Sequence, residues 1–150
     1  WWAQHPNRLS FPGRDWYDYN ARYRLTAQIE RFEPPRAVLI DDMIGTQREA
    51  HMDVRLHMEL DGQAISLDGY QLPNESYYLI FKDATAGTST YPAARFLVTE
   101  APEDDTVVVD FNKAYSPPCA FTDFATCPLP IPENVLNVAI EAGERYQAVH

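Results

Sequence analysis

The sequence is poor in positive charge and has no long apolar run. Its 12 Lys and Arg residues stand against 22 Asp and Glu residues, which gives a formal net charge of −10. Proteins that bind nucleic acids by neutralising phosphates need clustered Lys and Arg, so we expect no nucleic-acid partner. No apolar run approaches the roughly 20 residues that a membrane-spanning helix needs. We therefore expect no membrane partner either.

The motifs of the common cofactor-dependent enzymes are also missing. The sequence has no Gly-rich phosphate loop, no G-x-S-x-G motif, no H-E-x-x-H motif and no C-x-x-C pair. We therefore expect no cofactor, and any functional site must be argued from individual polar residues.

Cysteine is scarce, with Cys119 and Cys127 separated by seven residues. Three alternatives are open for this pair. A disulfide would stabilise the fold by roughly 2–3 kcal/mol on the chain-entropy model. Reduced thiols would fill space as small apolar groups. A metal site would need further ligands, and none of the four histidines lies between the two cysteines. We predict structural cysteines and no bound metal.

The size and composition of the chain predict one globular domain over residues 1–150. Apolar residues make up 45% of the chain and aromatic residues 13%, enough for a hydrophobic core without disulfide support. We expect a cytoplasmic location, with export as an open alternative because the sequence starts at Trp1 rather than Met. The sequence leaves the oligomeric state open.

Strand-type alternation is clearest from Met52 to Leu60, where every second residue is apolar and the residues between them are polar. This period of two is typical of a half-buried strand. The dipeptide Asp61-Gly62 follows, and it suits the positive φ angles of a type I′ turn. Because the alternation resumes beyond this turn, we predict a β-hairpin from Met52 to Leu67.

Other short runs rich in β-branched and aromatic residues predict further strands. These runs are Tyr23–Phe32, Arg36–Ile40, Tyr77–Lys82, Arg95–Thr99, Thr106–Phe111 and Val135–Glu141. The fold class that follows is all-β and mainly antiparallel: a β-barrel or two-sheet sandwich of about eight strands. We expect residues 1–20 to form an N-terminal strap, with a short helix as an alternative from Trp1 to Leu9. Five prolines make residues 116–133 a capping loop rather than a strand.

Three ordered motifs resemble the DUF1684 family, bacterial and archaeal proteins that carry a domain of unknown function. They are FKDATAGTSTYPAARFL (Phe81–Leu97), DFNKAYSPPCAFTDFATCPLPIPEN (Asp110–Asn134) and IEAGE (Ile140–Glu144). The resemblance covers roughly the second half of the chain and implies no particular activity.

Two polar residues at the end of the run VVVDFN are candidates for ligand binding. Asp110 and Asn112 lie two positions apart, so they share one face if the strand continues. With Tyr115 as a further donor, Asp110 could act as a general base or hold a substrate hydroxyl or amine. The structural alternative is that both side chains bond nearby backbone N–H groups and shape the following turn.

Asp83 and Arg95 flank the loop DATAGTSTY and complete the set of candidates. Arg95 enters an apolar strand, so a buried guanidinium would need Asp83 or Asp110 as its partner. Such a pair is a structural tie if it is closed off. It becomes an anchor for a carboxylate or phosphate ligand if Arg95 faces an open cavity.

Three functions therefore stay open. A small-molecule-binding or accessory domain is favoured, because no activated nucleophile, metal or phosphate cradle is evident. The first alternative is a cofactor-free enzyme, for example a cyclase or isomerase, in which Asp110 moves a proton and Arg95 or Tyr115 stabilises charge. The second is a structural or assembly module without a pocket. β-Barrels host all three roles.

Overall fold

The computed structural model describes residues 15–121 and 127–146. Its strands are β1 (Asp15–Trp16), β2 (Arg24–Asp41), β3 (Gln47–Leu60), β4 (Gln63–Gln71), β5 (Tyr77–Phe81), β6 (Arg95–Val98), β7 (Thr106–Asp110) and β8 (Glu144–Arg145). Single-turn 3-10 helices are η3 (Ala21–Tyr23), η4 (Phe111–Lys113), η5 (Pro118–Ala120) and η6 (Pro132–Asn134). In these ranges there is no α-helix, and no helix has the length and apolar character needed to cross a membrane.

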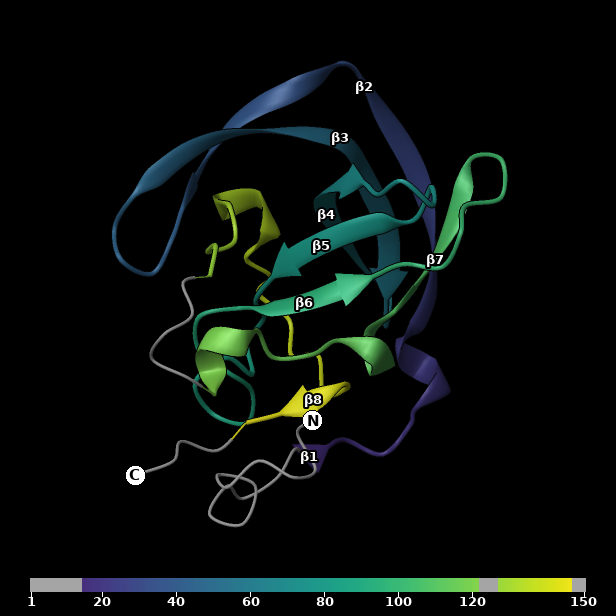
Figure 1. The fold of residues 1–150 in the computed structure, drawn as a ribbon. Coiled ribbons are helices and arrows are strands. Elements are labelled where there is room, and N and C mark those ends of the chain that lie inside the picture. Colours follow the sequence, from purple (N-terminus) through teal and green to yellow (C-terminus); the bar gives the residue numbers. More distant parts are fainter. Residues whose placement is uncertain (1–14, 122–126, 147–150) are drawn as a thin grey trace.

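Six strands form one antiparallel sheet in the order β6-β5-β4-β3-β2-β7, and β1 pairs with β8 in a separate small ribbon. The large sheet curls strongly (Figure 1). Its edge strand β6 bonds to the chain that follows β7, because Phe96 and Tyr115 exchange backbone hydrogen bonds of 2.8 and 2.9 Å. The predicted all-β, mainly antiparallel class is confirmed as a curled sheet. The choice between barrel and sandwich stays a prediction.

The predicted hairpin is confirmed. β3 and β4 pair from Val54↔Gly69 to Leu60↔Gln63, and the turn between them is Asp61-Gly62. The φ angles of Asp61 and Gly62 are +52° and +81°. Two consecutive positive φ angles match the right-handed twist of the flanking strands, which is why Asp-Gly is favoured here.

β2 joins two runs that the sequence analysis treated as separate strands. The strand continues through Pro34-Pro35, and its register against β3 shifts between Arg31 and Arg36. Prolines supply no N–H donor, so a strand can carry them only at an edge or at an irregularity of this kind.

The strand predicted over Val135–Glu141 is wrong. Residues 135–141 are irregular, with one parallel bridge between Lys82 and Val135. The segment bonds instead to the loop that follows β5, through Leu136 N to Lys82 O at 2.8 Å and Ala84 N to Val138 O at 2.9 Å. The side chains of residues 135–141 alternate in burial because of this packing. An alternation of period two in the sequence does not distinguish such packing from strand pairing in a sheet.

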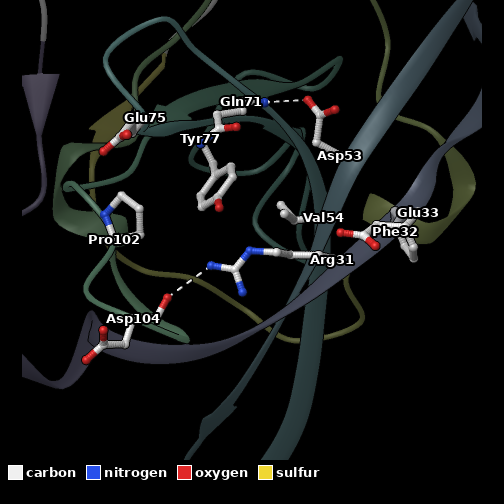
Figure 2. Close-up of a pocket in the computed structure, with 10 residues that line it drawn as sticks. All are labelled: Arg31, Phe32, Glu33, Asp53, Val54, Gln71, Glu75, Tyr77, Pro102 and Asp104. Carbon is white, nitrogen blue, oxygen red and sulfur yellow. Dashed lines mark hydrogen bonds between the residues drawn. The ribbon is translucent and has the colours of Figure 1, made fainter.

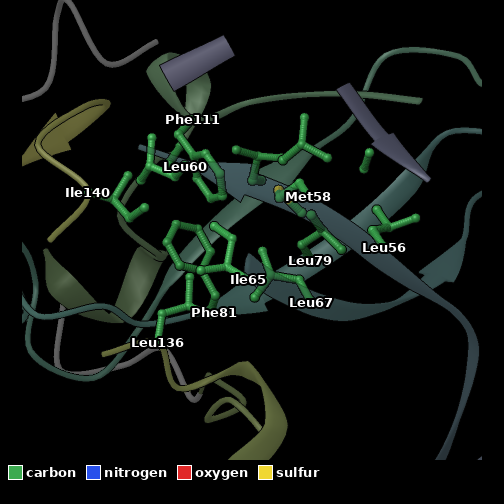
Figure 3. Packing of buried hydrophobic residues seen from close by; sticks show 14 of the residues in the cluster. Leu56, Met58, Leu60, Ile65, Leu67, Leu79, Phe81, Phe111, Leu136 and Ile140 are labelled. Atoms are coloured by element: carbon green, nitrogen blue, oxygen red, sulfur yellow. The ribbon is translucent and has the colours of Figure 1, made fainter. Parts of the chain in front are cut away.

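The core lies inside the curl of the sheet, where the labelled side chains of β3, β4 and β5 converge with Phe111, Leu136 and Ile140 (Figure 3). In β5, Leu79 and Phe81 join this core, whereas Ile80 points to the opposite face and packs with Cys127. The Pro-rich segment therefore contributes to a second apolar layer. Its role as a cap stays a prediction, and residues 122–126 lie outside the described residues. The alternative helix at Trp1–Leu9 also lies outside them, as do residues 1–14 of the predicted strap over residues 1–20; the described end of that strap contains β1, which pairs with β8.

Candidate functional site

A hollow of about 400 Å³ lies at the end of the sheet where β5 begins (Figure 2). Residues from β2, β3, β4 and β5 meet there with the turn before β5 and the turn between β6 and β7. The lining residues are Arg31, Phe32, Glu33, Asp53, Val54, Gln71, Glu75, Tyr77, Pro102 and Asp104.

Tyr77 is the buried polar residue of the hollow. Its side chain points into the space (Figure 2), and the residue is only 2% exposed, as is the neighbouring Val54. Two backbone bonds to Thr99 fix it in place, Tyr77 N to Thr99 Oγ1 and Thr99 N to Tyr77 O, both 2.9 Å. Within the described part of the chain its hydroxyl has no hydrogen-bond partner. The hydroxyl is not among the fully buried polar atoms without a partner in the described residues, so it is open to the hollow and available to a ligand.

The lining of the hollow is predominantly acidic. It carries four carboxylates and one guanidinium, that of Arg31. Arg31 is already engaged, because Nη1 lies 3.0 Å from Asp105 Oδ1 and Nη2 donates to Asp104 O at 3.0 Å. Asp53 accepts the Gln71 N–H at 2.7 Å. Among the described residues, the carboxylates of Glu33, Glu75 and Asp104 have neither a cation nor a donor. These three exposed carboxylates therefore stand around the hollow without a neutralising partner in the described part of the chain, although that of Asp104 turns outward and only its carbonyl faces the hollow (Figure 2).

Two lining residues adopt left-handed backbone conformations. Glu75 has a φ of +74° and Asp104 a φ of +55°. For a residue with a Cβ, this conformation costs roughly 1–2 kcal/mol. Tight turns impose it: Leu72 N bonds Ser76 O at 2.8 Å around Glu75, and Glu103 N bonds Thr106 O at 2.8 Å around Asp104. The directions of both side chains are therefore set by short, hydrogen-bonded loops.

Asp83 and Arg95 form a buried ion pair at the opposite end of β5 and β6. Arg95 Nη2 lies 3.2 Å from Asp83 Oδ1, and both side chains are 1% exposed. The other carboxylate oxygen, Asp83 Oδ2, accepts the Ile140 N–H at 2.6 Å and the Thr85 hydroxyl at 2.8 Å. The pair thus ties the loop after β5 to the IEAGE segment.

The guanidinium of Arg95 also bonds to backbone carbonyls. It donates to Ala142 O and, at 3.1 Å, to Ile140 O, and it lies 5.3 Å from the centroid of the Phe81 ring. Burial lowers the pKa of Arg95, and the nearby Asp83 carboxylate opposes this effect. Its partners all belong to the protein, so the geometry is that of a structural tie.

The structure does not bring Asp110 and Asn112 to Arg95. Asp110 Oδ1 accepts the Asn112 N–H at 3.0 Å and its side-chain amide at 2.9 Å, which caps η4. The Asn112 amide also exchanges two 2.9 Å hydrogen bonds with the backbone of Asn20. Tyr115 packs edge-on against Phe96. None of the five candidates, Asp83 and Arg95 included, lines the hollow, and their role in ligand binding stays a prediction.

Both cysteines are free thiols. Cys127 is buried, and its Sγ accepts the Cys119 N–H at 3.4 Å. Burial, together with a hydrogen bond to Cys127, raises the pKa of the Cys119 thiol to about 12. Across residues 15–121 and 127–146, no group of three His, Cys, Asp or Glu side chains is arranged to hold a metal ion.

Sequence reasoning missed the hollow and a second buried ion cluster. Asp68 is 1% exposed and accepts from Arg55 Nε at 2.7 Å and from Arg36 Nη2 at 2.7 Å. The sequence carries one indication of the Asp68 cluster. The alternation of β4 places Asp68 on the face of the sheet opposite Leu67. For the hollow, Asp53 has a similar signal on β3, whereas nothing in the sequence distinguishes Asp104 from its acidic neighbours Glu103 and Asp105.

Comparison with known proteins gives a family but no activity. The family described as "Protein of unknown function (DUF1684)" matches residues 9–145. The chain is also similar to the solution NMR structure of the uncharacterized protein from gene locus rrnAC0354 of Haloarcula marismortui, at 29% identity and a TM-score of 0.77. That match covers 97% of this chain and 83% of the other. No curated protein matches the chain. The chain belongs to the DUF1684 family.

Proposed function

We propose that this protein is a small-molecule-binding domain whose ligand occupies the hollow at the Tyr77 end of the sheet. The observation that carries the proposal is the hydroxyl of the buried residue Tyr77, which is open to the hollow, points into it and has no partner among the described residues. The volume of about 400 Å³ lies in the range of ligand pockets, roughly 300–1,000 Å³. The curled sheet would then act as a half-open barrel with the ligand at its mouth.

The alternative enzyme function would use Asp110 as a proton-transferring group. Such a group must reach the substrate, directly or through one water. Asp110 is 5% exposed and bonds within η4, so the proposal does not assign it this role. The hollow likewise favours binding over a structural module without a pocket.

A fragment library tests the proposal, with binding followed by amide shifts in ¹⁵N–¹H correlation spectra. We expect bound fragments to shift the amides of Asp53, Gln71 and Glu75. Tyr77→Phe removes one ligand hydrogen bond and should weaken binding about two- to tenfold. It should leave the melting temperature unchanged, because the hydroxyl has no partner in the described protein.

Tyr19→Phe, at an exposed tyrosine, is the matched control and should leave affinity unchanged. The proposal fails if no fragment shifts the hollow amides, or if Tyr77→Phe binds every fragment as tightly as the parent protein.

A further inference from the structure

We infer that the ligand of the hollow is a small organic amine that binds as an ammonium cation. This inference rests on the proposed function and adds the chemical class of the ligand. Two independent observations within the described residues carry it: the unpaired carboxylates of residues that line the hollow, and the unpaired hydroxyl of the buried residue Tyr77, which points into the hollow.

The charges of the hollow disfavour an anion. Its one guanidinium, Arg31, is already bound to the Asp105 carboxylate and to Asp104 O. A carboxylate or phosphate ligand would have to share the Arg31 guanidinium with Asp105 and lie beside the carboxylates of Glu33 and Glu75. Like charges that approach in this way disfavour binding. An ammonium ion instead gains partners and leaves the Arg31 bonds intact.

The polar groups of the hollow suit the donors of an ammonium ion. An ammonium group carries three N–H donors and no acceptor. Glu75 and Glu33 supply carboxylate acceptors without a partner among the described residues, and the Tyr77 oxygen supplies a neutral acceptor at the buried end. Donors that meet ionised acceptors form the stronger class of hydrogen bond.

The apolar part of the ligand also has a defined place. Val54 and the Tyr77 ring form the buried wall, and Pro102 lies on the facing turn. An aromatic face attracts a cation, which adds to the preference for an amine over a neutral compound of equal size. A metal ion fits less well, because no three acidic groups converge as ligands in the described residues.

Three probes of similar shape test the inference: benzylamine, benzyl alcohol and benzoate, each titrated into the ¹⁵N-labelled protein at one pH and ionic strength. We expect benzylamine to shift the amides of Asp53, Gln71 and Glu75 at the lowest concentration. Benzyl alcohol should bind more weakly, and benzoate should leave these amides unshifted. Raising the salt concentration should weaken benzylamine binding, because exposed charges are screened.

Two charge variants separate the site from the overall negative charge of the protein. Glu75→Gln removes a carboxylate of the hollow and should weaken benzylamine binding about two- to fivefold. Glu59→Gln, on the exposed side of β3, makes the same change in net charge and should have no effect. Neither side chain has a partner in the described residues, so both variants should melt like the parent protein.

The inference fails if benzoate or benzyl alcohol binds the hollow at least as tightly as benzylamine, or if Glu75→Gln binds benzylamine as the parent does. It also fails if other library fragments occupy the hollow and benzylamine does not. In each case the proposed function stands, since that function fails only when no compound reaches the hollow or when Tyr77→Phe changes no affinity.

Discussion

Replacing Asp83 with Asn should destabilise this protein more than any other single change of carboxylate to amide that we describe. The substitution nearly preserves shape and removes the charge that faces Arg95. It also replaces one of the two carboxylate oxygens, both of which accept hydrogen bonds, by an NH₂ group that can only donate. Oδ1 faces the Arg95 guanidinium and Oδ2 faces the Ile140 N–H, so in either orientation the amide NH₂ faces one of these donors and cannot accept from it.

The magnitude follows from burial. Both side chains of the Asp83–Arg95 pair are 1% exposed. Removing one partner of a buried pair leaves an uncompensated charge and costs about 3–5 kcal/mol. A domain of this size has a total stability of about 5–15 kcal/mol, so the loss is a large fraction of it. At about 2–4 °C per kcal/mol, the melting temperature should fall by roughly 6–20 °C.

The assay is equilibrium unfolding in urea, followed by tryptophan fluorescence and circular dichroism. Glu100→Gln is the matched control, because Glu100 also pairs with an arginine, Arg24, at 2.9 Å. There the side chains are 43% and 36% exposed for Arg24 and Glu100. Water screens that pair, and its loss should cost less than about 1 kcal/mol.

A stabilising role for the buried Asp83–Arg95 pair is refuted if Asp83→Asn and Glu100→Gln lower the free energy of unfolding by the same amount. A second variant, Asp83→Asn with Arg95→Met, removes both charges and should recover part of the stability lost in Asp83→Asn. If the double variant is instead less stable than Asp83→Asn alone by as much again, the buried Arg95 charge does not depend on the Asp83 carboxylate.

Two further predictions concern the glycine of the IEAGE motif and the thiols. Gly143→Ala should cost about 1–3 kcal/mol more than Gly62→Ala in urea unfolding. Both glycines have φ near +80°, but a Cβ at Gly143 would lie 2.6 Å from Ala114 O and nothing lies within 4 Å at Gly62; equal costs would contradict this. Iodoacetamide at pH 8 should modify Cys119 far more slowly in the folded than in the unfolded protein, because a pKa of about 12 lowers the thiolate fraction roughly a thousandfold. Equal rates, assigned by peptide mass spectrometry, would rule that out.

The sequence by itself determined the elements whose information is local. The alternation from Met52 to Leu60 and the Asp61-Gly62 turn specify their hairpin, because side-chain period and turn conformation depend on neighbouring residues. The same local pattern was misleading at Val135–Glu141, where alternating burial arises from contacts with Lys82 and Ala84 and not from a ladder.

Only the tertiary structure decided which charges meet. Arg95 could have paired with Asp83 or Asp110; the curl of the sheet gives it Asp83 and leaves Asp110 to cap η4. The hollow is a product of the same curl, because it joins Arg31 of β2 to Asp104 of a turn far along the chain. Such contacts depend on how strands twist and close, a property of the whole sheet that no short stretch of sequence encodes.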